Sequence, residues 1–281
     1  MFCDFSPVNE TVAKLIVATD LDATLLDHQT YDYSAALPAI ARLKSNGCPI
    51  VFNSSKTQAE QTMLRKALGI DAPFIVENGA AVVIPPGQLG VPKAATPEVK
   101  TFGPAHGDLI EHIRRLREQQ GFQFKGFSDL TAEAVAQLTG LSVPEAAAAK
   151  QRMGSEPLQW KDSEAAFEQF SRALAEVGLQ TTRGGRFRHV MAEANKGNAL
   201  QWLVSRYRNV FPQVQWTVVA LGDSPNDLPM LQAADVGVLI ENPHRAPFEV
   251  TDVERLLRPK QPGPTGWASA IAQLCDEILN R

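Results

Sequence analysis

The sequence predicts an α/β protein whose core is a doubly wound parallel sheet, interrupted by an inserted α+β domain. Residues 15–19 form an apolar, β-branched run that is typical of a strand buried on both faces. Strand-like and helix-like segments then alternate up to residue 84 and again from residue 191, which is the pattern of a doubly wound sheet. Residues 121–127 instead alternate apolar and polar side chains, as a half-exposed strand does.

The composition indicates a globular protein without a nucleic-acid partner. A chain of 281 residues can bury a sizeable core and form two lobes. Its 44% apolar and 21% charged side chains are ordinary values for a soluble domain. The net charge of −4 gives no general attraction for a polyanion, so basic residues must be judged by their local surroundings.

The cysteines and the apolar runs exclude further classes. Cys3, Cys48 and Cys275 are too few and too scattered for a disulfide framework or a clustered zinc site. No apolar run is long enough to cross a bilayer, so we expect no membrane partner. Residues 1–14 are mixed in character and unlike a signal peptide, so we expect a frayed extension and a cytoplasmic protein, either a monomer or a homodimer.

The first part of the chain begins the doubly wound pattern. The expected strands cover residues 15–19, 49–53 and 72–76. The expected helices cover residues 33–46 and 59–68. The first helix carries an apolar stripe at helical spacing and ends at Asn46-Gly47, a usual helix stop. Because strand, helix and strand follow one another, the strands are expected to be parallel neighbours.

From about Pro85 proline and glycine punctuate a loop, and a different pattern follows. The expected helices cover residues 108–120, 130–138, 143–152 and 163–177. The expected strands cover residues 121–127, 157–160 and 179–190, the last as a pair that turns at Gly184-Gly185. This mixture predicts an α+β unit with a sheet open on one face.

The last part returns to the first pattern. Helices are expected over residues 196–207, through Met230 and Leu231, and over 268–279, with strands over 217–221 and 236–240. Residues 262–267 are rich in proline and glycine and are expected to form a loop. The chain therefore divides into a core of residues 1–84 and 191–281 and an inserted domain of residues 85–190.

Two aspartates follow the first strand. In an extended chain Asp20 and Asp22 point the same way, and Leu21 between them points into the core. The carboxyl end of a strand is where open α/β sheets bind ligands. Two carboxylates repel each other there, so a metal ion, a lysine or backbone N–H groups must compensate them.

Three further polar signals occur at or just after strand ends. Ser54 follows the second strand, Lys196 begins a helix after the insert, and Gly222-Asp223-x-x-Asn226-Asp227 follows a later strand. In this order the four motifs resemble those of the haloacid dehalogenase (HAD) superfamily of phosphotransferases over nearly the whole chain. The resemblance implies a HAD-like, Rossmannoid core and an inserted cap of the C2B type, the type found in sugar phosphatases.

Within that superfamily several segments resemble the mannosyl-3-phosphoglycerate phosphatases. These segments are Asn53-Ser54-Ser55-Lys56-Thr57, Glu77-Asn78-Gly79-Ala80, Gly184-Gly185-Arg186-Phe187-Arg188-His189-Val190 and Gly263-Pro264-Thr265-Gly266-Trp267. The resemblance implies a Mg²⁺-dependent phosphatase that releases phosphate from a sugar-glycerate substrate and yields mannosylglycerate, a compatible solute.

The resemblance also implies a role for each motif. Asp20 would attack phosphorus to form an aspartyl-phosphate, and Asp22 would act as general acid and then general base. Mg²⁺ would be held by Asp20, the backbone carbonyl of Asp22 and Asp223, with Asp227 supporting the metal shell and orienting Lys196. Ser54 would bind the phosphoryl oxygens, and Lys196 would offset the negative charge.

The rest of the substrate would be bound by residues near the strand ends and by the insert. The expected contacts are Ser55, Lys56, Glu77, Asn78, Arg186 and His189. Arg186 would hold the carboxylate, with Arg183 and Arg188 as alternates. On a strand Arg186 and Arg188 share one face and His189 lies on the other, so these side chains cannot all line one pocket.

The residues leave other interpretations open. The substrate could be glucosyl-3-phosphoglycerate or another sugar phosphate, or the enzyme could be a phosphomannomutase-like transferase. Outside the enzymes, a phospho-accepting receiver module or a sugar-phosphate binding protein would also use such an acidic pocket. Ser54 could be only a helix cap, Lys196 a solvated helix residue and Asp227 a helix-start residue.

One position departs from the superfamily pattern. The residue after the second aspartate is usually glycine in that superfamily, and here it is Ala23. Alanine would be strained at a positive φ and harmless at a negative one. We expect a negative φ at Ala23.

Overall fold

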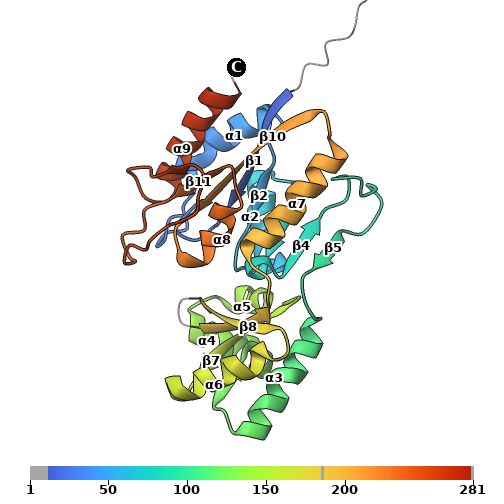
Figure 1. The fold of residues 1–281 in the computed structure, drawn as a ribbon, viewed down its shortest axis with the longest axis vertical. Helices are drawn as coiled ribbons and strands as arrows, with labels where there is room; N and C mark the ends of the chain where they lie inside the picture. The colour runs from blue at the N-terminus through green and yellow to red at the C-terminus, as the bar shows by residue number, and fades with distance from the viewer. Residues whose placement is uncertain (1–11, 185–186, 280–281) are drawn as a thin grey trace, which may run out of the picture.

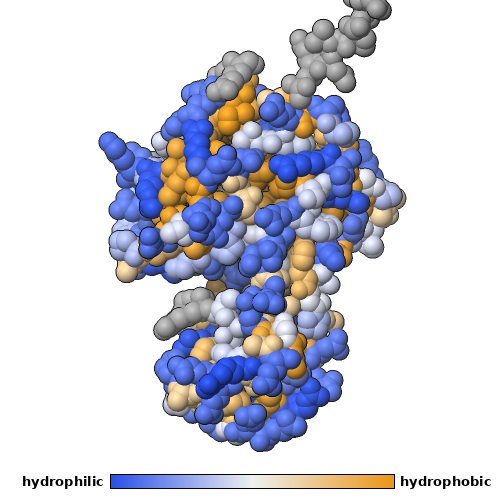
Figure 2. Space-filling model, viewed as in Figure 1, coloured by the Kyte–Doolittle hydropathy of each residue, from blue (hydrophilic) through white to orange (hydrophobic). Residues whose placement is uncertain are grey.

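The computed structural model describes residues 12–184 and 187–279 (Figure 1). Cys3, Arg186 and residues 1–11 of the expected N-terminal extension therefore lie outside the described residues. Residues 12–14 were also expected to be frayed, but they form the start of strand β1 (Val12–Thr19). A core lobe, built on the parallel sheet, stands above an insert lobe, built on the sheet that contains β7 and β8. A narrower waist joins the two lobes in the space-filling view (Figure 2).

The central sheet confirms the doubly wound prediction. Its strand order is β12-β11-β10-β1-β2, and every pair is parallel. The strands are β1 (Val12–Thr19), β2 (Ile50–Phe52), β10 (Val214–Gly222), β11 (Val236–Leu239) and β12 (Leu256–Leu257). Because the strands are parallel, the carboxyl ends of β1 and β10 lie side by side: Thr19 pairs with Leu221.

Three more strands extend the core lobe beyond β2. β3 (Phe74–Val76) meets the β2 edge through a parallel bridge between Asn53 and Ile75. β4 (Ala81–Ile84) then pairs antiparallel with β3, and β5 (Glu98–Thr101) pairs antiparallel with β4. The domain boundary expected at residue 85 thus falls in the loop between two paired strands.

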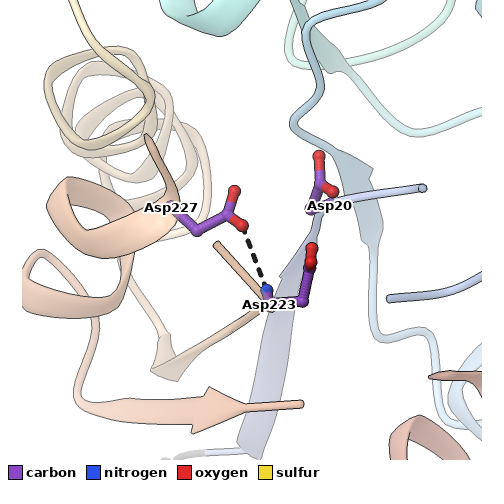
Figure 3. A group of neighbouring side chains, drawn as sticks. All are labelled: Asp20, Asp223 and Asp227. Carbon is purple, nitrogen blue, oxygen red and sulfur yellow. Dashed lines mark hydrogen bonds between the residues drawn. The ribbon is translucent and has the colours of Figure 1, made fainter. Parts of the chain in front are cut away.

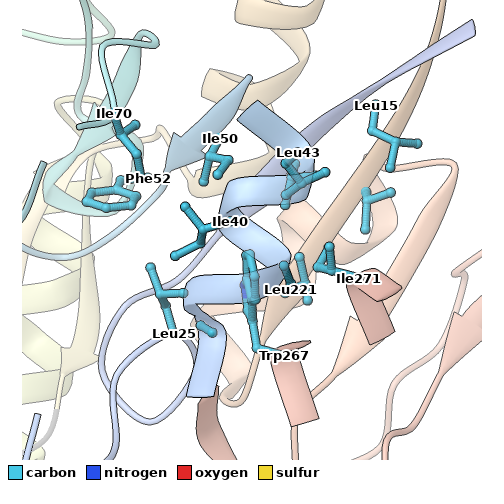
Figure 4. Close-up of a cluster of buried hydrophobic side chains, with 14 of the residues drawn as sticks. Leu15, Leu25, Ile40, Leu43, Ile50, Phe52, Ile70, Leu221, Trp267 and Ile271 are labelled. Atoms are coloured by element: carbon cyan, nitrogen blue, oxygen red, sulfur yellow. The ribbon is translucent and has the colours of Figure 1, made fainter. Parts of the chain in front are cut away.

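The helices of the core lobe cover both faces of the sheet. They are α1 (Leu37–Ser45), α2 (Gln58–Leu68), α7 (Lys196–Val210), α8 (Leu228–Gln232) and α9 (Gly263–Ile278), with 3₁₀ turns at Ser34–Ala36, Glu77–Gly79 and Pro225–Asp227. Leu15 and Val17 of β1 pack with α1 and α9 (Figure 4). Ile16 and Ala18 pack with α7 and α8. This alternation buries β1 on both faces and holds its end in place.

The segment 262–267 was expected to be a loop, and this expectation was wrong. Helix α9 begins at Gly263 and has Pro264 in its first turn, where a missing N–H costs nothing. Trp267 is fully buried in the core (Figure 4). Its Nε1 donates a hydrogen bond of 3.0 Å to Thr19 Oγ1. The proline and glycine content of this segment suggested a loop, but the segment is the start of helix α9, which packs against the end of β1.

The insert lobe is an antiparallel sheet with helices. Its strand order is β6-β7-β9-β8, formed by β6 (Phe124–Gly126), β7 (Ser155–Trp160), β9 (Phe187–Ala192) and β8 (Leu179–Gly184). Its helices are α3 (His106–Gln120), α4 (Ala132–Thr139), α5 (Val143–Ala149) and α6 (Glu164–Ala175), with a 3₁₀ turn at Phe127–Asp129. The pairing of β8 with β9 confirms the expected strand pair. No helix among the described residues has both the length and the apolar character needed to cross a membrane.

Candidate active site

The acidic residues of the motifs meet at the carboxyl ends of β1 and β10 (Figure 3). Asp20 follows β1, Asp223 follows β10, and Lys196 is the first residue of α7. The Lys196 Nζ lies 2.6 Å from Asp20 Oδ1 and 2.6 Å from Asp227 Oδ1. The structure thus brings together the residues that the motifs predicted, although Lys196 is 176 positions from Asp20.

Asp223 and Asp227 are held by their neighbours. Asp223 accepts hydrogen bonds from Thr24 Oγ1 at 3.2 Å and from Asn242 Nδ2 at 2.6 Å. Asp227 Oδ2 accepts from the backbone N–H groups of Asp223 and Ser224 at 3.1 and 3.0 Å (Figure 3). Both oxygens of Asp227 therefore have partners. One oxygen binds Lys196, and the other accepts hydrogen bonds from the loop at residues 223–224.

Burial and mutual repulsion shift the protonation of this cluster. Burial raises the pKa of Asp20 well above its usual value, the Lys196 ammonium opposes the shift, and the carboxylates of Asp227, Asp223 and Asp22 add to it. Burial and the Asp227 charge also raise the pKa of Asp223. For Lys196 burial favours the neutral amine, but the charges of Asp20 and Asp227 outweigh it and raise its pKa. Lys196 therefore remains an ammonium ion.

Asp22 lies at the more exposed side of the cluster. Its Oδ2 forms an ion pair of 3.1 Å with Lys56 Nζ, while its Oδ1 is buried without a partner. Burial lowers the pKa of Lys56, but the charges of Asp22 and Glu60 reverse this and raise it. Leu21 is fully buried, so the chain after β1 alternates as predicted.

A cavity of about 470 Å³ opens above the acidic cluster and is lined by both lobes. From the core lobe it is lined by Asp20, Asp22, Ala23, His28, Tyr31, Ser55, Lys56, Glu60, Asn78, Asp223, Ser224, Asn226, Asn242 and Arg245. From the insert lobe it is lined by Phe127, Thr139, Leu141, Ala149, Arg152, Pro157, Phe187 and His189. Side chains from both lobes can therefore contact one ligand.

Among the expected substrate contacts, Ser55, Lys56, Asn78 and His189 line this cavity, and Ser54 lies buried next to them. The backbone carbonyl of Ser54 accepts from the Asn78 N–H at 2.9 Å, and Asn78 Oδ1 accepts from Asn226 Nδ2 at 3.1 Å. The capping box of α2, in which Thr57 Oγ1 accepts from the Glu60 N–H, follows directly and fixes the Ser54 loop.

Arg188 and His189 of the insert, which are neighbours on β9, have different surroundings: His189 lines the cavity and Arg188 does not. Arg188 pairs with Glu164 at 2.6 Å and stacks over Phe167, and it does not line the cavity. Burial and the Arg152 charge lower the pKa of His189 to about 3, so its imidazole is neutral, and its Nδ1 has no partner. The opposite facing of Arg188 and His189 on β9 agrees with the alternation expected for a strand.

Glu77 is placed away from the cavity, at the junction of the two lobes. Its carboxylate is fully buried and accepts hydrogen bonds from the Met153 N–H at 2.7 Å and from Ser155 Oγ at 2.7 Å. Arg152 Nε lies 3.6 Å from Glu77, and Arg152 Nη2 donates to the Ser55 carbonyl at 3.3 Å. Glu77 and Arg152 therefore join the start of β7 to the core lobe.

Replacing Glu77 with Gln is expected to lower the free energy of unfolding by about 3 kcal/mol, because it leaves Arg152 as a buried charge without its partner. Amide exchange at residues 153–155 should become faster. Glu164→Gln is the matched control, since it removes an exposed partner of Arg188 and should cost less than about 1 kcal/mol. Equal stability of the two variants in urea unfolding would contradict a junction role for Glu77.

The backbone at Ala23 contradicts the expected negative φ. Ala23 has a φ of 61°, in the left-handed region, and its side chain is 6% exposed. The prediction was wrong because the turn after Asp22 needs this conformation whichever residue occupies it. Left-handed backbone costs a non-glycine residue about 1–2 kcal/mol, so the site retains some strain.

Ala23→Gly is expected to raise the free energy of unfolding by about 0.5–1 kcal/mol, because relief of strain exceeds the entropy that glycine adds to the unfolded chain. The control is Ala80→Gly, at a buried alanine with a φ of −63°, which should lose about 1 kcal/mol. Both values can be measured by denaturant unfolding. A loss of stability in both variants would show that Ala23 carries no strain.

The donor set of the cluster fits a divalent cation. One carboxylate oxygen each from Asp20, Asp223 and Asp227 lies within 4.8 Å of the others (Figure 3). Carboxylate oxygens are the ligands that Mg²⁺ prefers in proteins, and Mg²⁺ needs only one or two of them. One oxygen of Asp227 binds the Lys196 ammonium and the other accepts three hydrogen bonds, whereas each oxygen of Asp223 accepts from one neutral side chain. Asp20 and Asp223 are therefore the more available pair.

Comparisons with known proteins agree with this geometry. The family model described as haloacid dehalogenase-like hydrolase matches residues 17–93 and 155–253. A glucosyl-3-phosphoglycerate/mannosyl-3-phosphoglycerate phosphatase of Methanococcoides burtonii is 36% identical over 272 residues, covering 95% of this chain and 99% of that protein. A protein of the same description from Persephonella marina is 35% identical over 269 residues, covering 94% and 98%.

Solved structures share the fold. A haloacid dehalogenase-like hydrolase from Bacteroides thetaiotaomicron has a TM-score of 0.66 at 16% identity and covers 93% of this chain and 99% of its own. The sucrose-phosphatase from Synechocystis has a TM-score of 0.60 at 17% identity and covers 96% and 99%. The family match and the full-length relatives exclude the receiver module and the non-catalytic binding protein. The chain belongs to the haloacid dehalogenase-like hydrolases and is a phosphomonoester hydrolase of that family.

Proposed function

We propose that this enzyme is a Mg²⁺-dependent phosphatase that hydrolyses mannosyl-3-phosphoglycerate to mannosylglycerate, with glucosyl-3-phosphoglycerate as the alternative substrate. The observation that carries the proposed chemistry is the buried contact of Lys196 with Asp20, beside Asp22 and beneath a cavity lined by both lobes. The choice of substrate is supported by the two relatives of 36% and 35% identity, whose descriptions name both compounds.

The proposed reaction has two steps, and both use the acidic pair. Asp20 attacks phosphorus and forms an aspartyl-phosphate, while Asp22 gives a proton to the leaving alkoxide. Asp22 then takes a proton from the water that hydrolyses the aspartyl-phosphate. The half-exposed position of Asp22 suits exchange of protons with water and substrate, whereas the contact of Asp20 with Lys196 holds the nucleophile in place.

Other groups neutralise and orient the phosphate. Asp20 and Asp223 would hold the Mg²⁺ ion, which supplies positive charge for the phosphoryl oxygens when it is bound. Lys196 balances the charge of Asp20, and Asp227 is its positioning residue. Ser54 and nearby backbone N–H groups would receive the phosphoryl oxygens. The insert, expected over residues 85–190 although β5 in that range pairs with the core-lobe strand β4, would act as a cap that excludes water from the cavity.

The test is phosphate release from a panel of substrates at equal concentration. The panel contains mannosyl-3-phosphoglycerate, glucosyl-3-phosphoglycerate, mannose 6-phosphate and glycerol 3-phosphate. We expect kcat/KM for at least one glycosyl-3-phosphoglycerate to exceed the values for the two simple phosphates by about 100-fold or more, because binding of the remote groups lowers the barrier. Activity on simple sugar phosphates alone would refute the proposed substrate but not the phosphatase chemistry.

Mg²⁺ is expected to stabilise the folded protein, and the effect should grow with pH. Metal binding requires ionised carboxylates, and the pKa values of Asp20 and Asp223 are raised, so protons compete with Mg²⁺ at low pH. At a free Mg²⁺ concentration of 100 times the Kd, binding should add about 2.7 kcal/mol to the free energy of unfolding. Thermal unfolding with and without Mg²⁺ at pH 8 and at pH 5.5 measures the stabilisation at each pH. Asp223→Asn should weaken the shift, and Glu164→Gln should leave it unchanged.

A further inference from the structure

A substrate carboxylate in the active-site cavity needs a positive group, and three cations in or beside the cavity, among the described residues, are already engaged. Lys196 is held between Asp20 and Asp227, and Lys56 is paired with Asp22. The Arg152 side chain is 3% exposed, and its guanidinium donates to the carbonyls of Ala149 and Ser55 and to Ser155. Lys196 and Arg152 cannot turn to a new anion without breaking a buried contact, and Lys56 would have to leave its ion pair with Asp22.

Arg245 is the exception among the described residues that line the cavity. Its guanidinium makes no hydrogen bond or ion pair with any residue in the described ranges, and its side chain is exposed. It also lines a neighbouring cavity of about 450 Å³, which shares Asp223 and Asn242 with the active-site cavity. Arg245 therefore stands at the mouth of the active site, with five N–H donors available to a ligand.

The backbone of Arg245 is held even though its guanidinium makes no hydrogen bond or ion pair with a described residue and acts on Asp223 only through its charge. The Arg245 N–H donates to the Asn242 carbonyl at 3.1 Å, and Asn242 Nδ2 donates to Asp223 at 2.6 Å. The ring of His244 stacks on His28, with ring centroids 4.7 Å apart. This turn is therefore anchored both to Asp223 and to the segment that follows β1, so the guanidinium has a fixed base beside the reaction centre.

The charges of the site show what Arg245 can bind. Lys56, Lys196 and a divalent cation would together balance the carboxylates of Asp20, Asp22, Asp223 and Asp227. A glycosyl-3-phosphoglycerate then brings a further carboxylate besides its phosphate, and a guanidinium fork matches a carboxylate with two parallel hydrogen bonds. We propose that Arg245, on the core lobe, binds the substrate carboxylate and sets the preference for phosphoglycerate esters. This inference rests on the proposed function.

The test compares substrates that differ only in the carboxylate. The pair consists of the preferred glycosyl-3-phosphoglycerate and its analogue in which the carboxylate is reduced to a primary alcohol. Arg245→Ala should lower kcat/KM for the carboxylate substrate by about 10- to 100-fold and change the value for the alcohol by less than about 3-fold. Arg245→Lys should retain part of the preference, because it keeps the charge but loses the fork.

Arg258→Ala is the matched control, since Arg258 is exposed and lines the neighbouring cavity but not the active-site cavity. It should behave as the wild type. An equal loss on both substrates of the pair, or no loss on either, would overturn the role of Arg245. If the glycosyl compounds are not hydrolysed, inhibition by 3-phosphoglycerate and by glycerol 3-phosphate provides the same comparison. A selective loss of 3-phosphoglycerate inhibition in Arg245→Ala would then support Arg245 while the proposed substrate fails.

Discussion

Asp20→Asn is expected to reduce turnover by at least about 10⁴-fold, the largest effect of any single substitution in this enzyme. An amide cannot attack phosphorus, yet it keeps the size of the carboxylate and can still accept a hydrogen bond from Lys196 at the position of Oδ1. The loss should therefore appear in kcat, with little effect on substrate binding. Phosphate release under single-turnover conditions measures it.

The variant should remain folded, because removing one charge relieves the burial penalty and the repulsion that raise the pKa of Asp20. Its free energy of unfolding without Mg²⁺ should equal or exceed that of the wild type. Asp22→Asn can be compared with it, because this variant keeps the nucleophile: formation of the aspartyl-phosphate should slow mainly with poor leaving groups, and its hydrolysis should slow with every substrate. If Asp20→Asn kept more than about 1% of wild-type turnover, a mechanism with direct attack by water would replace the aspartyl-phosphate.

The core fold could be predicted because its signals are local. The apolar run of β1 and the helical spacing of α1 are properties of adjacent residues, and strands that alternate with helices permit few topologies. The meeting of Asp20, Asp223 and Lys196 then follows from topology, since parallel strands end at one edge of the sheet. Residues 15–22 therefore indicated the location of the site before any tertiary contact was known.

The supporting contacts could not be predicted, because they join loops that are distant in sequence. Thr24 reaches Asp223 across 199 positions, and Asn242 approaches the same carboxylate from another loop. Thr24 belongs to the first motif, Asp20-x-Asp22-x-Thr24, but that spacing does not indicate its contact with Asp223. No spacing in the sequence marks Asn242, Arg152 or Arg245. Glu77 is the opposite case, a residue that the sequence marked but the cavity does not use. Its position after a strand suggested a ligand contact, but its carboxylate accepts hydrogen bonds from Met153 and Ser155 at the start of β7.

Two local errors, at Ala23 and at the start of α9, have a common origin. In each, a residue preference was used to infer backbone conformation, and a tertiary constraint decided it instead. The turn into the active site requires a positive φ at Ala23, and burial of Trp267 beside Thr19 holds a proline- and glycine-rich segment in a helix. Both constraints act at the end of β1, where the catalytic geometry is set.

Lys196→Met is expected to affect both stability and activity. It leaves the carboxylates of Asp20 and Asp227 buried without their cation, and breaking a buried pair in this way costs about 3–5 kcal/mol. Loss of the ammonium should also lower kcat by about 10²- to 10³-fold, as removal of one fixed charge does at other active sites. Urea unfolding without metal and phosphate release with Mg²⁺ measure the two effects.

The pH dependence distinguishes lost charge from lost packing. Without Lys196 the pKa of Asp20 should rise further, and an acid whose folded pKa is raised stabilises the folded state as the pH falls through that pKa. The stability deficit of Lys196→Met should therefore shrink from pH 8 to pH 5. Lys56→Met is the control, since its partner Asp22 has a 41% exposed side chain and the pair should contribute less than about 1 kcal/mol. A deficit that is independent of pH, or equal losses for the two lysines, would mean that Lys196 acts by filling space, and the electrostatic basis of the proposed chemistry would fail.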